Sequence, residues 1–172
     1  MEIQTFDKNG VLASIAEAVT QLAGLMASVD EDQVNIIPYK GSWTAPQLLT
    51  HVTKSITGMS KAMLRDAKPA ERNPGERIEE LKKVFLDFSN TFQSPEFIIP
   101  EIGIYERHPT IGKLNEAFKQ FKENAGIANL NELVEGLPLG PITKLEIIYF
   151  TLFHTKRHLH QMRNICEALE NK

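Results

Sequence analysis

The chain has 172 residues, of which 42% are apolar and 24% are charged, a mixture that suits a single globular domain over residues 1–172 and argues against a disordered chain. Its formal net charge of -3 lacks the basic field with which proteins attract nucleic acids or anionic lipids. The one cysteine, Cys166, can form neither an intramolecular disulfide nor a cysteine zinc site by itself, which favours a reducing compartment.

The sequence shows neither a recognisable secretory signal nor a membrane-spanning stretch. The first residues, MEIQTFDKNG, show no basic region followed by an apolar core, so they do not resemble a secretory signal. No stretch approaches the roughly 18 uninterrupted apolar residues of a membrane span. We therefore expect a cytoplasmic protein with no membrane partner and no nucleic-acid partner.

The first predicted helix covers about residues 10–27. Apolar residues recur there at three- and four-residue steps, as expected for one face of a helix. They are Val11, Ile15, Ala18, Val19, Leu22 and Leu25. Residues 28–42 contain Asp, Asn, Pro and Gly and predict a connection.

The second predicted helix has a sharp start. Thr44 and Gln47 have the spacing of a capping box, in which each side chain bonds to the backbone N–H of the other residue. Trp43 and Leu48 fit the hydrophobic staple that often accompanies such a box. We expect this helix to end near Arg65.

The middle of the chain breaks the helical pattern at residues 67–75. Asn73, Pro74 and Glu76 then suit the cap, first and third positions of another helix, which would end near Phe92.

Residues 94–109 follow, with three prolines and Gly103, and predict an irregular crossover. Another helix is expected after Thr110 and should end or kink near Gly126.

The last predicted helix repeats the start signal of the second. Thr143 is the cap, Glu146 its partner, and Ile142 with Ile147 the staple. The helix can run to about Leu169. We see no strand with convincing period-two alternation. The fold class is therefore all-α, with four long helices in a bundle and a long central crossover that carries an extra short helix.

Two histidines on the last predicted helix indicate a metal site. His154 and His158 are four residues apart, so their rings lie about 40° apart on one face, one turn above the other. At this spacing, two imidazoles can reach one ion at about 2.0–2.1 Å. They interrupt an otherwise largely apolar stripe, formed by Ile147, Phe150, Thr151, His154, His158, Gln161, Ile165 and Leu169.

Burial of such polar rings is costly unless they find partners. A shared metal would satisfy both rings, with Gln161 as a hydrogen-bond partner behind one of them. His51 on the second helix has inward-facing neighbours too, and Ser55 and Gly58 would leave room beside its ring. The competing interpretation is that each histidine is an ordinary core residue bonded to a carbonyl or carboxylate. His160 should face away, and His108 in the crossover is either an extra ligand, a residue at the mouth of the site, or without a role.

Two segments resemble the DinB-like family. GSWTAPQLLTHVTKSITG is similar to its second helix, where a Trp-Ser/Thr start precedes a histidine. LPLGPITKLEIIYFTLFHTKRHLHQMRNI is similar to its last helix, where a Gly-Pro-Leu/Ile-Thr start leads to His-x-x-x-His. In that helix an Arg often precedes the second His and a Gln follows it, here Arg157 and Gln161.

The resemblance implies an up-down-down-up bundle with a metal site on His51, His154 and His158, and it makes a homodimer plausible. Family members include thiol S-transferases that use bacillithiol and a mycothiol-dependent maleylpyruvate isomerase, while many are classed only as metal-dependent hydrolases. The stretch 69–109 departs from the family pattern, so the shape of the mouth and the roles of Tyr105, Glu106 and His108 stay open.

Three neutral imidazoles would leave a coordination position free, as in catalytic rather than structural zinc sites. The cofactor is expected to be a divalent transition metal, with zinc and nickel favoured and iron, manganese and copper open. Zinc could lower the pKa of bound water toward ~7 or ionise a low-molecular-weight thiol. No general base is visible, because Thr155, Lys156 and Arg157 stand between the last-helix histidines, and Arg157 is either solvated or faces an anionic substrate.

Three hypotheses follow. The first is a metal-dependent enzyme, a thiol S-transferase or a hydrolase, that acts on a small molecule. The second is a metal-binding or interaction protein of the same fold without catalysis. The third is a histidine layer that merely satisfies polar groups in the core.

Overall fold

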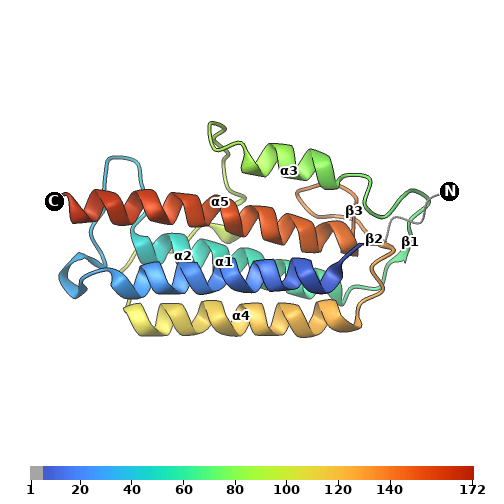
Figure 1. Ribbon diagram of the computed structural model, residues 1–172, viewed down its shortest axis with the longest axis horizontal. Coiled ribbons are helices and arrows are strands. Elements are labelled where there is room, and N and C mark those ends of the chain that lie inside the picture. Colours follow the sequence, from blue (N-terminus) through green and yellow to red (C-terminus); the bar gives the residue numbers. More distant parts are fainter. Residues whose placement is uncertain (1–5) are drawn as a thin grey trace.

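The computed structural model describes residues 6–172, and four long helices form a bundle within it (Figure 1). They are α1 (Lys8–Ser28), α2 (Ala45–Met63), α4 (Arg107–Ile127) and α5 (Lys144–Glu170). In Figure 1, α1 and α5 run in one direction while α2 and α4 run in the other, so the path is up-down-down-up as expected.

The packing order places α1 and α2 at opposite corners of the bundle, because each packs mainly against α4 and α5. A shorter helix, α3 (Ile78–Leu86), lies outside the bundle against α5. The seam between α2 and α5 is therefore partly covered by the crossover, and this seam holds the histidines.

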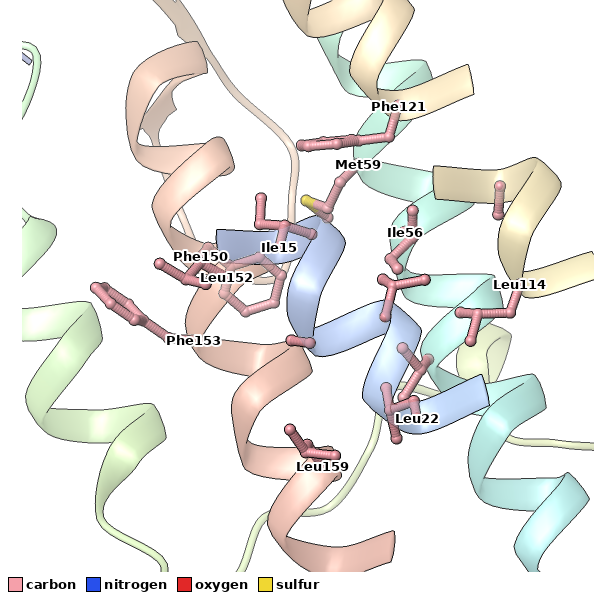
Figure 2. Close-up of a cluster of buried hydrophobic side chains, with 14 of the residues drawn as sticks. Ile15, Leu22, Ile56, Met59, Leu114, Phe121, Phe150, Leu152, Phe153 and Leu159 are labelled. Atoms are coloured by element: carbon pink, nitrogen blue, oxygen red, sulfur yellow. The ribbon is translucent and has the colours of Figure 1, made fainter. Parts of the chain in front are cut away.

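The core is built from one apolar stripe on each long helix (Figure 2). Ile15 and Leu22 of α1 are fully buried, as are Leu114 and Phe121 of α4. By length and composition alone α1 could cross a membrane, but its apolar side chains are used in the core of the bundle. This signal is weak, since the core helix of a soluble protein passes the same test.

Both predicted capping boxes are present. The Thr44 hydroxyl accepts from the Gln47 N–H at 3.4 Å, and the Gln47 side chain accepts from the Thr44 N–H at 3.0 Å. On α5, Thr143 accepts from the Glu146 N–H at 3.1 Å, and Glu146 accepts from the Thr143 N–H at 2.9 Å. The two helices that carry the histidines therefore begin where the sequence places them.

The third helix differs from its prediction. Asn73 does not cap it. Instead, its side-chain oxygen accepts from the Gly75 N–H at 2.9 Å and closes a turn, so α3 starts at Ile78. It ends at Leu86 rather than near Phe92, because the Asp87 carboxylate accepts from the Ser89 N–H at 3.0 Å and holds the next turn.

Helix α4 begins at Arg107, one turn before the predicted start. Pro109 is tolerated because the first N–H groups of a helix have no partner within it.

The structure also contains a small antiparallel sheet that the sequence did not predict. It consists of β1 (Lys68–Pro69), β2 (Glu132–Val134) and β3 (Ile142–Thr143), with Lys68 opposite Leu133 and Leu133 opposite Thr143. Strands of two or three residues are too short to show alternation. Two 3-10 turns complete the elements, η1 (Glu31–Gln33) and η2 (Glu96–Ile98).

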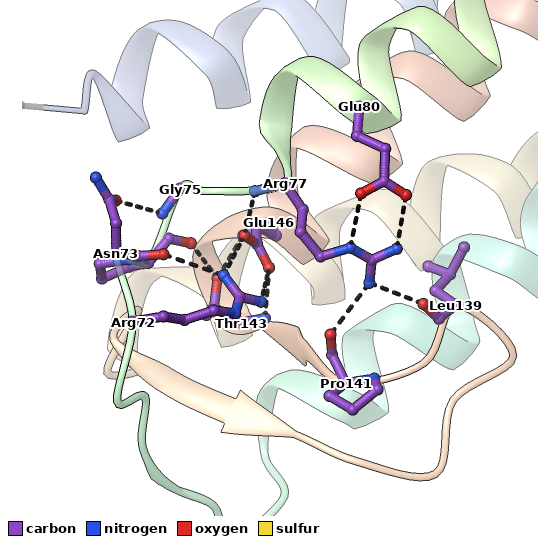
Figure 3. A network of polar contacts seen from close by, with 10 residues as sticks. Arg72, Asn73, Gly75, Arg77, Glu80, Leu139, Pro141, Thr143 and Glu146 are labelled. Atoms are coloured by element: carbon purple, nitrogen blue, oxygen red, sulfur yellow. Dashed lines mark hydrogen bonds and ion pairs between the residues drawn. The ribbon is translucent and has the colours of Figure 1, made fainter.

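A buried ion pair fixes the crossover to the start of α5 (Figure 3). The Glu146 carboxylate is fully buried and accepts two hydrogen bonds from Arg72, both at 2.7 Å, and one from the Arg77 backbone N–H at 2.8 Å. Burial alone would raise the pKa of Glu146, but Arg72 and the backbone N–H groups of Thr143 and Arg77 outweigh it, so the pKa is lowered. This network sets where α3 lies on α5.

Candidate metal centre

Three histidine rings from two helices meet at one point. His51 comes from α2, whereas His154 and His158 come from consecutive turns of α5. The Nε2 atom of His158 lies 3.0 Å from Nε2 of His51 and 3.1 Å from Nε2 of His154. His51, His154 and His158 are only 1%, 6% and 8% exposed, so all three are buried. The sequence-predicted residues are thus brought together, in a group that could hold a metal ion.

The outer nitrogens of two rings have fixed partners. His51 Nδ1 lies 2.9 Å from the carbonyl oxygen of Ile98, which can only accept, so Nδ1 carries the proton. His158 Nδ1 lies 2.9 Å from the side-chain oxygen of Gln161, the partner that the sequence suggested. In neutral imidazoles, both Nε2 atoms then present lone pairs to the centre.

This arrangement fits a divalent cation better than a metal-free polar layer. Two lone pairs facing each other at 3.0 Å repel unless a proton or a cation lies between them. Ligands at about 2.0–2.1 Å from one ion would be separated by roughly 2.8–3.4 Å for octahedral to tetrahedral angles. The separations of 3.0 and 3.1 Å lie in that interval.

Burial keeps the three imidazoles neutral, as metal ligands must be. It lowers the pKa of His51, although the hydrogen bond to Ile98 opposes the shift. It lowers the pKa of His154 well below its ordinary value, with repulsion from His158, His51 and Arg157 adding to the effect. For His158, burial and then the neighbouring His51 lower the pKa to about 3, against the hydrogen bond to Gln161.

A large cavity of ≈ 1120 Å³ opens on the three rings. Ser55 and Gly58 line it beside His51, as their small size suggested. Its other walls come from α3, α5, residues 88–99, and the segments around Trp43 and Leu139. None of the described residues that line it is Asp or Glu. The three rings therefore border a space large enough for a small molecule.

The mouth of the cavity is not formed by the three crossover residues whose roles the sequence left open. Tyr105, Glu106 and His108 do not line the cavity. The Tyr105 hydroxyl donates to the Glu101 carbonyl at 2.6 Å, and His108 is exposed in the first turn of α4.

His160 does not lie where the sequence predicts. It lines the same cavity instead of simply facing away, and its ring stacks on Phe88 at a centroid distance of 4.2 Å.

Arg157 is half-buried, and its guanidinium is engaged by the crossover. Its guanidinium donates to the carbonyl oxygens of Phe85 at 3.4 Å, Asp87 at 3.0 Å and also Asn90. It also lies 4.7 Å from the centre of the Phe92 ring. Burial lowers its pKa from the ordinary value, opposed by Asp87. Arg157 therefore holds the end of α3 and the following turn against α5, the helix that carries His154 and His158.

Comparisons with known proteins agree with this fold. The model of the DinB superfamily matches residues 15–162. The crystal structure of TT2238, a four-helix bundle protein, superposes with a TM-score of 0.59 and 13% sequence identity, covering 91% of this chain and 98% of that one. No curated protein matches the sequence with significance. At this identity, the likeness to TT2238 concerns the fold alone.

Proposed function

Because the chain belongs to the DinB superfamily and has three histidines that could hold a metal ion, we propose that it is a metal-dependent thiol S-transferase. It joins a low-molecular-weight thiol to a small electrophilic substrate, with zinc or nickel as the bound ion. The supporting observation is the convergence of three Nε2 atoms on a cavity whose described lining contains no carboxylate.

The absence of an acid among those lining residues favours thiol transfer over hydrolysis, the other reaction class considered. Hydrolases commonly use a carboxylate as general base, as in the His-Glu-x-x-His proteases. A thiol has an ordinary pKa of about 8.5, so a modest shift suffices to ionise it at neutral pH. A divalent ion bound here would supply a Lewis acid that deprotonates a coordinated thiol.

The residues of the chain hold and orient the reactants. His51, His154 and His158 would hold the ion, and Ile98 and Gln161 orient two of the rings. In the reaction, the thiolate sulfur donates an electron pair to a carbon of the electrophile and a C–S bond forms. The bond from that carbon to the leaving group breaks, the leaving group keeps its electron pair, and the thiol proton passes to solvent.

The test uses untagged protein loaded with one equivalent of zinc or nickel. It is mixed with 1-chloro-2,4-dinitrobenzene or its anionic analogue 4-chloro-3,5-dinitrobenzoate and, in turn, with bacillithiol, mycothiol, glutathione or cysteine, and conjugate formation is followed by absorbance. We expect turnover above the uncatalysed rate with at least one thiol, and its loss in His51→Ala. His108→Ala, which changes an exposed histidine outside the cavity, should keep the activity. Fully loaded protein without turnover for any of the four thiols would contradict the proposal.

We also propose a cytoplasmic location, as the sequence suggested, and a homodimer, as the family resemblance suggested. Size-exclusion chromatography with light scattering tests the dimer, and a monomer at micromolar concentration would contradict it.

A further inference from the structure

We infer that the electrophile is an aromatic anion, whose ring lies against Phe85 and Phe92 and whose charge is balanced by the positive centre of the cavity. The inference rests on the proposed function, since it names the substrate class of the same site. It is carried by the arrangement of rings and charges around the three histidines.

A continuous series of aromatic contacts leads from the histidines to the rim. The ring centroid of Phe150 lies 5.2 Å from that of His154 and 5.0 Å from that of Phe85, at an interplanar angle of 80°. Phe85 lies 5.6 Å from Phe92. Such distances are typical of favourable edge-to-face and offset pairs, so these rings form one wall, which we call the phenylalanine wall.

Exposure increases along this wall. Phe150 at the inner end is 6% exposed, whereas Phe92 at the rim is 50% exposed. Phe92 is held at the rim by the Arg157 guanidinium, 4.7 Å from its ring centre, so its exposure belongs to an ordered part of the cavity. Half-exposed aromatic side chains gain free energy when an apolar ligand covers them.

A further ring borders the histidines. Trp43 lines the cavity, and its ring centroid is 4.9 Å from that of His51. A planar ligand in this cavity thus meets π-systems beside both metal-bearing helices, namely Trp43 beside His51 and the phenylalanine wall beside His154. Aromatic ligands match such surfaces better than aliphatic ones, by roughly two- to tenfold in affinity per ring pair.

The charges of the residues that line the cavity disfavour a cationic ligand. Lys54 lies 2.5 Å from Glu101, which neutralises it. Arg157 donates only to carbonyl oxygens, and no carboxylate of residues 6–172 forms an ion pair with it. With a divalent ion on three neutral imidazoles, the cavity has excess positive charge and no lining acid, so it favours an anionic ligand.

The test compares four probes by isothermal titration calorimetry on zinc-loaded protein. The probes are 3-phenylpropanoate, 3-cyclohexylpropanoate, propanoate and 3-phenylpropylammonium. We expect 3-phenylpropanoate to bind at least about tenfold more tightly than propanoate, roughly two- to tenfold more tightly than the cyclohexyl analogue, and at least tenfold more tightly than the cation. Propanoate binding within twofold of 3-phenylpropanoate, or equal binding of the cation, would overturn the inference.

Substitutions at Phe92 test where the phenyl ring of the ligand binds. Phe92→Ala should weaken 3-phenylpropanoate about two- to tenfold and leave propanoate unchanged, and Phe92→Leu should weaken it less. Ile127→Ala, which shortens an exposed apolar side chain at the end of α4, is the matched control and should change neither ligand. Equal effects of Phe92→Ala on both probes would mean that the ring binds elsewhere, which would also overturn the inference.

The same titrations on zinc-free protein separate this inference from the proposed function. The phenylalanine wall contains no metal ligand, so the preference for the phenyl ring over the cyclohexyl ring should persist without zinc. A persistent ring preference in protein without transferase activity supports the inference and counts against the function. Transferase activity in protein that shows no preference for the phenyl ring supports the proposed function and counts against the inference.

Discussion

The Nδ1 atom of His51 lies 2.9 Å from the carbonyl oxygen of Ile98, 47 positions further along the chain. His51 belongs to α2, whereas Ile98 belongs to η2 in the crossover. The crossover therefore determines which nitrogen of this imidazole faces the centre. It also supplies part of the cavity wall, so the long connection both orients His51 and shapes the pocket.

Gln161 should tune metal affinity through His158. Gln161→Leu removes the acceptor for the His158 Nδ1 proton, which leaves the ring free to rotate or change tautomer. We expect a loss of zinc affinity of roughly 10- to 100-fold, measured by competition with a chromophoric chelator. Gln161→Glu keeps an acceptor and should retain the affinity, and Lys156→Gln on the exposed face of α5 is the neutral control. Unchanged affinity in Gln161→Leu would show that the hydrogen bond is dispensable.

Acid should destabilise the metal-free protein below about pH 6.5. Burial lowers the pKa values of His51, His154 and His158, the last to about 3, whereas in the unfolded chain they return to about 6.5. Below pH 6.5 the unfolded state therefore binds more protons, and the free energy of unfolding falls as the pH decreases toward 3.

Urea unfolding of chelator-treated protein between pH 7.5 and 5 measures this slope. His158→Gln should flatten it, and His108→Ala should leave it unchanged. A free energy of unfolding that is equally high at pH 7.5 and pH 5 would be inconsistent with neutral buried imidazoles. Zinc affinity should fall over the same interval, because protons compete for the Nε2 atoms.

Glu146 should be a main determinant of stability away from the site. Glu146→Ala leaves Arg72 without its buried partner and removes the side-chain half of the α5 capping box. We expect a loss of roughly 3–5 kcal/mol in the free energy of unfolding, measured by urea denaturation. Glu80→Ala, which breaks a pair with Arg77 at an exposed carboxylate, should cost less than about 1 kcal/mol. Similar losses for both variants would contradict the role given to Glu146.

Arg157 should hold the cavity wall in place. Arg157→Gln removes the hydrogen bonds to the carbonyls of Phe85, Asp87 and Asn90. We expect faster amide hydrogen exchange over residues 85–99 and little change in the four bundle helices. Arg163→Gln, on an exposed part of the same helix, is the control. Exchange over residues 85–99 that stays at the wild-type rate would mean that other contacts hold the wall.

The bundle and the histidine group could be predicted because their signals are local. The capping boxes at Thr44 and Thr143 fix where α2 and α5 begin, and the four-residue spacing of His154 and His158 fixes their common face. Their meeting with His51 needed one further assumption, that both apolar stripes face each other across the bundle.

The crossover could not be predicted because its structure depends on contacts distant in sequence. The start of α3 is decided by the Asn73 turn and by Glu146, which accepts the Arg77 N–H from 69 positions away. The role of Ile98 likewise appears only once this segment is folded onto α2, and that of Phe92 only once it is folded onto α5. The closely spaced phenylalanines Phe85, Phe88 and Phe92 were the one sequence signal that could have indicated an aromatic wall.

The most direct test of the account is anomalous scattering, collected at the zinc and nickel edges from crystals of untagged protein. We expect one peak within about 2.0–2.1 Å of Nε2 in each of His51, His154 and His158, with the Nδ1 atoms of His51 and His158 still bonded to Ile98 and Gln161. A map from metal-supplemented crystals with no peak among the three rings, or with a peak bound by other residues, would contradict it.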